Sequence, residues 1–157
     1  MNSASIGEIK KELQRLDVDT LQSICLRLAK YKKENKELLS YLLSDADDEP
    51  GYIRSIKEEM DVLFTELDGR NLYITKKMLR KILRFANRQI KYSSSPQTEL
   101  ELRIYFCERI KEAGIPLTAG TVLFNLYQQQ LKKIMSVLAK LPEDYQVDYA
   151  STIEAIQ

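Results

Sequence analysis

Residues 71–92, NLYITKKMLRKILRFANRQIKY, carry both the clearest helical pattern and the strongest charge bias of this chain. Their apolar side chains recur at spacings of three and four residues, which is typical of an amphipathic helix. The serine run that follows ends at Ser95, which can cap a new helix in which Pro96 takes the first position. The stretch therefore predicts one helix over about 71–92 and another after Ser95. The apolar positions of the first are Leu79, Ile82, Leu83, Ala86 and Ile90.

Helical spacing continues on both sides of this stretch. Ser5 and Glu8 can form a capping box, which predicts a first helix from Ser5 to about residue 16. Residues 44–51 are acidic and end in Pro-Gly, so we expect a loop there. The 19–43 segment is either one helix or a helix pair that is broken in its polar middle, Lys32 to Lys36, with the boundary at Asn35. The other expected helices cover about 5–16, 53–67, 71–92, 96–113, 121–141 and a short tail to 156.

The helix after Ser95 has an ambiguous pattern. Residues 99–106 alternate between apolar and polar side chains, which taken alone indicates a strand. The cap at Ser95 and the stop signal Ala113-Gly114 favour a helix instead. We therefore expect a helix here as well.

A chain of 157 residues has the size of one ordinary domain. We expect a single helical domain over residues 1–157. The predicted fold class is all-α, with about six or seven helices in an irregular bundle or a short HEAT/armadillo-like stack of helix hairpins.

Composition argues against most catalytic sites. Histidine is absent, which removes the commonest general base and metal ligand. None of the five glycines stands in a phosphate-loop spacing. Cys25 and Cys107 are too few for a disulfide scaffold or a four-ligand zinc site, and we expect both to be buried, reduced thiols. The sequence therefore predicts no metal site, no cofactor and no enzyme.

The chain also lacks signals for a membrane. Its first eleven residues are polar, and no apolar run approaches the roughly 18 residues that a membrane span needs. We expect a cytoplasmic protein.

Charge is unevenly distributed although the formal net charge is only +1. Residues 45–68 contain nine acidic residues against Arg54 and Lys57, whereas residues 69–98 contain eight basic residues and no acidic one. At roughly 100° per residue, seven of these cations fall within about 140° of the 71–92 helix, and Tyr73 points into the same arc. The arc is a candidate polyanion site that consists of Lys76, Lys77, Arg80, Lys81, Arg84, Arg88, Lys91 and Tyr73.

Two other interpretations of this arc compete with ligand binding. The basic helix can lie antiparallel to the acidic 53–67 helix, so that the two neutralise each other, or the arc can be a solvated face. The sequence favours these two interpretations over ligand binding, because consecutive hairpin partners of opposite charge are common and a nearly neutral total charge weakens the attraction for phosphate polymers. Acidic side chains of Glu58, Asp61 and Glu66 that point away from the arc would leave it free to bind.

The sequence supports two functional hypotheses. The first hypothesis is a noncatalytic helical module whose partner is a protein, and the alternative is nucleic-acid or polyanion binding through the basic arc. Tyrosines near the C-terminus are either part of a partner-facing surface or half-buried core. They are Tyr127, Tyr145 and Tyr149.

The order of these features resembles small uncharacterised all-helical proteins of bacteria. The resemblance rests on Lys10-Lys11-Glu12-Leu13, a Leu- and Tyr-rich segment from Asp19 to Leu43, an acidic loop, a basic helix, and residues 100–116 leading into 123–141. It covers most of the chain in layout, without a diagnostic motif. It implies the helical fold and no particular activity.

Overall fold

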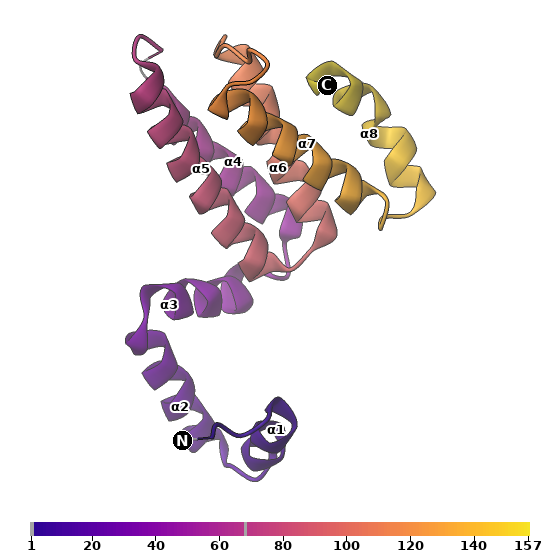
Figure 1. The fold of residues 1–157 in the computed structure, drawn as a ribbon. Coiled ribbons are helices and arrows are strands. Elements are labelled where there is room, and N and C mark those ends of the chain that lie inside the picture. The colour runs from indigo at the N-terminus through magenta and orange to yellow at the C-terminus, as the bar shows by residue number, and fades with distance from the viewer. Residues whose placement is uncertain (1, 68) are drawn as a thin grey trace. The chain divides into compact units, whose positions relative to one another are not determined.

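The computed structural model describes residues 2–67 and 69–157, and over these residues the chain forms eight α-helices and no strand (Figure 1). The predicted all-α class is confirmed. The predicted number of six or seven helices is too low, because the 19–43 segment is divided and the tail forms a full helix. The chain divides into two compact units, and the boundary along the sequence falls between Ser44 and Asp45. We call residues 2–44 the N-terminal unit and residues 45–157 the C-terminal unit, and the single domain over 1–157 stays a prediction.

The N-terminal unit contains α1 (Ile6–Gln14), α2 (Val18–Tyr31) and α3 (Lys33–Ser40), and a π-helical turn, η1 (Tyr41–Asp45), leads out of it. The predicted capping box is confirmed. The backbone N–H of Glu8 donates to Ser5 Oγ at 3.2 Å, and the backbone N–H of Ser5 donates to the Glu8 carboxylate at 2.7 Å.

The break in the second predicted helix lies at Lys32 rather than at Asn35. Lys32 has extended backbone angles, φ −141° and ψ 147°. Asn35 has a different role, because its side-chain amide donates to the carbonyl oxygen of Leu28 at 2.8 Å. This bond ties α3 back to α2, and the two helices pack against each other.

The C-terminal unit contains α4 (Glu49–Thr65), α5 (Leu72–Ser93), α6 (Pro96–Glu112), α7 (Val122–Leu138) and α8 (Glu143–Ile156). The loop expected as far as Gly51 is shorter than predicted. Asp48 caps α4 by accepting from the backbone N–H of Gly51 at 3.1 Å, and Pro50 lies in the first turn, where a missing N–H costs nothing.

Helix α6 is the centre of the C-terminal unit and contacts α4, α5, α7 and α8 (Figure 1). Leu100, Leu102 and Phe106 are completely buried. A helix with neighbours on several sides is apolar around most of its circumference and loses the 3.6-residue period. This explains the strand-like alternation of residues 99–106, and the expected helix is confirmed.

A buried arginine fastens this central helix to its neighbours. Arg103 of α6 donates to Asn87 of α5 at 3.0 Å and to Gln130 of α7 at 2.9 Å, and it also pairs with Glu99 at 3.1 Å. Polar groups that are buried together in this way fix one arrangement of the helices, because any other arrangement leaves them unpaired.

The two cysteines differ in environment. Cys107 is buried in α6, and burial raises the pKa of its thiol to about 12. Cys25 is exposed on α2, so the expected burial is wrong for this residue.

Over the residues that the structure describes, no helix combines the length and the apolar character needed to cross a membrane.

Candidate polyanion-binding face

Helix α5 carries the basic arc, and local sequence signals fix both of its ends. Asn71 caps the start, because its side-chain oxygen accepts from the backbone N–H groups of Tyr73 at 2.9 Å and Ile74 at 3.3 Å. Ser94 ends the helix in a left-handed conformation with φ 58°. At 1.5 Å per residue, the 22 residues between these caps form a rod of about 33 Å.

Burial of one side of α5 decides which way the cations point. Leu79, Ile82 and Ala86 are almost completely buried, and α5 contacts α4 and α6. Tyr52 of α4 also donates to the side-chain oxygen of Gln89 at 2.7 Å. Because this side faces the interior, the opposite side of the helix faces solvent.

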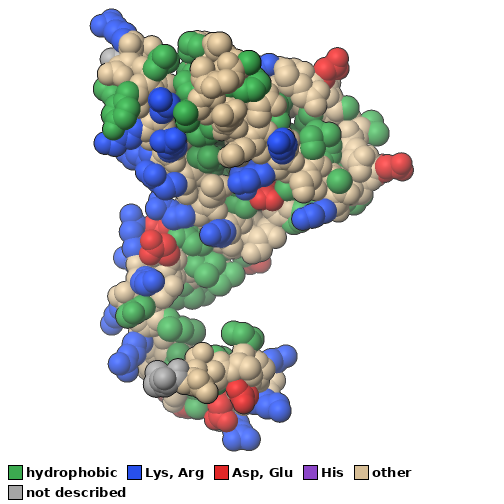
Figure 2. All heavy atoms as spheres, in the orientation of Figure 1, with side chains coloured by type: hydrophobic (Ala, Val, Ile, Leu, Met, Phe, Trp, Pro, Cys, Tyr) green, Lys and Arg blue, Asp and Glu red, His purple; other side chains and the backbone are tan. Residues whose placement is uncertain are grey.

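The basic face is therefore open to solvent along α5. We use this name for Lys76, Lys77, Arg80, Lys81, Arg84, Arg88 and Lys91. Lys76 is half-buried and the other six are exposed, and Figure 2 shows Lys and Arg side chains gathered along the outer edge of this helix.

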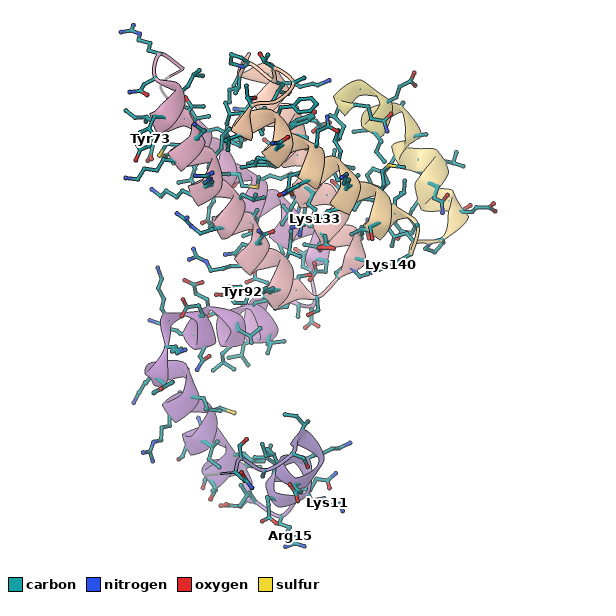
Figure 3. All side chains as sticks on the ribbon, in the orientation of Figure 1. Lys11, Arg15, Tyr73, Tyr92, Lys133 and Lys140 are labelled. Atoms are coloured by element: carbon teal, nitrogen blue, oxygen red, sulfur yellow. The ribbon has the colours of Figure 1, made fainter. Side chains whose placement is uncertain are left out.

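An exposed aromatic ring stands at one end of the basic face. Tyr73 is 72% exposed, and Figure 3 shows Tyr73 and Tyr92 at opposite ends of α5. Tyr73, Lys76, Lys77, Arg80 and Arg84 together line a surface hollow of about 300 Å³. The hollow brings one ring and four cations together in the N-terminal half of the helix.

Asp61 of α4 is directed to α6 rather than to α5. Asp61 pairs with Arg109 of α6 at 3.0 Å and accepts from the hydroxyl of Tyr105 at 2.6 Å. Lys57, a cation of α4, pairs with Glu101 of α6 at 2.8 Å. Among the ion pairs of residues 2–67 and 69–157, none includes a member of the basic face. Direct pairing of the basic face with the acidic helix is therefore not observed among the described residues, which leaves a solvated face or a ligand-binding face.

The contacts between α4, α6 and α8 alter several pKa values. Burial alone would raise the pKa of Glu101, but hydrogen bonds from Lys57 and Tyr149 outweigh it and the pKa is lowered. Burial, reinforced by the bond to Asp61, raises the pKa of the Tyr105 phenol to about 12. Tyr149 donates to Glu101, and burial together with this bond raises its pKa to about 12. These groups stabilise the helix packing and lie on elements other than α5.

The C-terminal tyrosines differ in burial, and only Tyr127 belongs to the core. Tyr127 is buried in α7, and its hydroxyl donates to the backbone carbonyl of Ile156 at the end of α8. Tyr145 and Tyr149 are half-buried on α8, and Tyr145 donates to Gln97 at 3.4 Å.

Within the described part of the chain, no group of three or more Cys, Asp or Glu side chains is placed to hold a metal ion.

Sequence reasoning missed a second surface, which lies in the N-terminal unit. Apolar residues recur at helical spacing through residues 19–43, yet Leu28 and Leu42 are each 57% exposed. Helical spacing shows which side of a helix is apolar, but it does not show whether another element covers that side.

Comparison with protein-family models, with curated proteins and with solved structures found no match to this chain. The resemblance to small helical bacterial proteins therefore stays a prediction.

Proposed function

We propose that this protein is a noncatalytic binding module that holds a polyanion, foremost a nucleic acid, on the basic face of α5. The single observation that carries this proposal is the arrangement of seven cations on one face of one helix, without an ion pair to any described acidic residue. Cations that lack intramolecular partners keep their full attraction for phosphate. When a nucleic acid docks, they displace the counterions that are condensed on its phosphates.

The dimensions of the face suit a nucleic-acid strand. Lys76 and Lys91 are fifteen residues apart, which is about 22 Å along a helix. In a stacked strand the phosphates are about 3.4 Å apart along the axis, so the face can span at most about six phosphates of a stacked strand and fewer of an extended one. Tyr73 adds an exposed ring on which an unpaired base can stack, and this favours a single strand over a duplex.

Fluorescence anisotropy with a labelled single strand of about 20 nucleotides tests the proposal. We expect binding at about 50 mM salt, and log Kobs should fall linearly with log salt at about −0.7 per phosphate contact. The double variant Arg80→Glu/Arg84→Glu should weaken binding at least about tenfold. The control Lys140→Glu changes an exposed cation in the turn after α7 and should leave binding nearly unchanged.

Two results would contradict the proposal. Absence of binding at about 50 mM salt would remove the polyanion function altogether. Equal losses in the α5 double variant and in Lys140→Glu would show that general charge, rather than the basic face, attracts the strand.

Two further expectations belong to the same proposal. Contacts between α4 and α5 and between α6 and α7 support two helix hairpins that stack in a HEAT-like manner, with α5 on one outer surface. A cytoplasmic location, expected from the sequence, would give the module access to nucleic acid.

A further inference from the structure

The N-terminal unit contains an apolar groove between α2 and α3. Its volume is about 230 Å³. The groove lies within residues 25–42, so its shape is a property of this unit alone. Its lining consists of Cys25, Leu28, Ala29, Asn35, Leu38, Leu39 and Leu42.

The groove is not covered by other parts of the unit. Over residues 2–40 every side chain is at least partly exposed to solvent. Large apolar side chains outside the groove are exposed too, including Tyr31 at 77% and Leu43 at 75%, and Figure 2 shows hydrophobic side chains on the surface of this unit. A contiguous exposed apolar surface with polar edges marks a site of protein interaction.

The edge of the groove is strongly basic. Residues 27–36 contain five cations and only one acidic residue, Glu34. Arg27 and Lys30 line a second hollow that shares Leu28 with the groove, which places their side chains beside it. Lys33 pairs with Glu37 at 3.6 Å, whereas the other four cations enter no ion pair among the described residues. These four are Arg27, Lys30, Lys32 and Lys36.

We propose that this groove binds an amphipathic helix of another protein, with acidic residues beside its apolar stripe. A groove between two helices takes apolar anchors from a third helix at spacings of three and four residues. Acidic residues of that helix would meet Arg27 and Lys30 beside the groove. Charge complementarity therefore identifies the partner class, in addition to the apolar contact.

The same charges argue against a second copy of this chain. A symmetric dimer places the same patch of both subunits face to face. Two grooves with basic edges would bring like charges together across the interface, and that juxtaposition is costly. An acidic helix offers the apolar stripe without this repulsion.

Two synthetic peptides test the inference on the full-length chain. One is an amphipathic helix with Leu at positions i, i+3, i+4 and i+7 and Glu on both flanks, and the other carries Lys in place of Glu. We expect the acidic peptide to bind at least about tenfold more tightly. Occupancy should also slow alkylation of Cys25, which lines the groove, while Cys107 stays buried and unreactive in both states.

Two pairs of variants locate the binding site. Leu28→Lys should weaken the acidic peptide at least about tenfold, whereas Val147→Lys, at an exposed apolar position of α8, should not. Lys30→Glu should weaken binding several-fold and reduce its salt dependence, whereas Lys132→Glu on α7 should not. Both groove positions are exposed, so the variants should keep the helical circular dichroism of the parent chain.

Several outcomes would overturn this inference. They are equal binding of the two peptides, absence of binding by both, and a dimer in sedimentation equilibrium that Leu28→Lys dissociates. Slow alkylation of Cys25 in the peptide-free chain would show that the chain covers its own groove, and this also overturns it. Polyanion binding is independent, because Arg80→Glu/Arg84→Glu should leave peptide binding unchanged.

Discussion

Asp61 of α4 forms an ion pair with Arg109 of α6, with Oδ1 lying 3.0 Å from the guanidinium Nε. The same carboxylate accepts from Tyr105 of α6 at 2.6 Å, so its charge is used between α4 and α6. Lys57 and Glu101 pair across the same two helices. The acidic segment and the basic helix are neighbours in sequence, yet among the described residues no ion pair joins an acidic residue to the basic face of α5.

Removal of one cation at a time should change the salt dependence of strand binding in steps. Arg84→Gln is expected to reduce the slope of log Kobs against log salt by about 0.7 for a single strand. The free energy of unfolding should stay nearly the same, because Arg84 is exposed and lacks an ion pair among described residues. Anisotropy titrations at several salt concentrations, together with urea denaturation, measure both quantities. An unchanged slope would place the phosphate contacts elsewhere.

Substitution of Asp61 separates packing from binding. Asp61→Asn should lower the free energy of unfolding by about 1 kcal/mol, since the pair is partly exposed to solvent and screened. Strand affinity should change little, because Asp61 is directed to α6. The matched control is Glu58→Gln, at an exposed position of the same helix. A marked gain in affinity for Asp61→Asn, without a similar gain for the control, would show that Asp61 neutralises the basic face.

Arg103 is expected to be the most sensitive charged position of the C-terminal unit. Its side chain is 8% exposed and contacts Asn87, Gln130 and Glu99. Arg103→Met should lower the free energy of unfolding by about 3 kcal/mol, because it leaves buried polar partners without a donor. Chemical denaturation measures the loss, with exposed Lys132→Met as control. An equal and small effect in both variants would show that the network adds no stability.

Alkaline titration should reveal the buried phenols. The pKa of Tyr105 is about 12 in the folded chain and near 10 in an unfolded one. The folded state therefore holds this proton more tightly, and its contribution to stability is fully present below pH 10 and is lost as the pH rises toward 12. Phenolate absorbance should show this late ionisation in native protein, one fewer such phenol in Tyr105→Phe, and none in urea. Ionisation of all phenols near pH 10 in native protein would contradict the buried hydrogen bond to Asp61.

Local signals in the sequence were sufficient for the helices and for the candidate cations. Ser5, Asn71 and Ser95 each cap the helix that follows, because a side-chain oxygen next to a free backbone N–H acts over only two or three residues. The grouping of seven cations on one side of α5 follows from helical geometry together with the apolar positions opposite. These features depend on near neighbours along the chain, so they are visible without a structure.

Tertiary structure alone decided what those side chains meet. The rotation of α4 against α6 directs Asp61 to Arg109, and neither spacing nor composition specifies that rotation. Residues 99–106 lack a helical period because α6 is surrounded by neighbouring helices. Leu28 and Leu42 follow a helical apolar spacing, but the N-terminal unit leaves both side chains exposed. The sequence by itself determined the helices, their caps and the charged arc, since these arise from interactions over a few residues. Pairing, burial and the groove required the fold, because they depend on which distant surfaces come together.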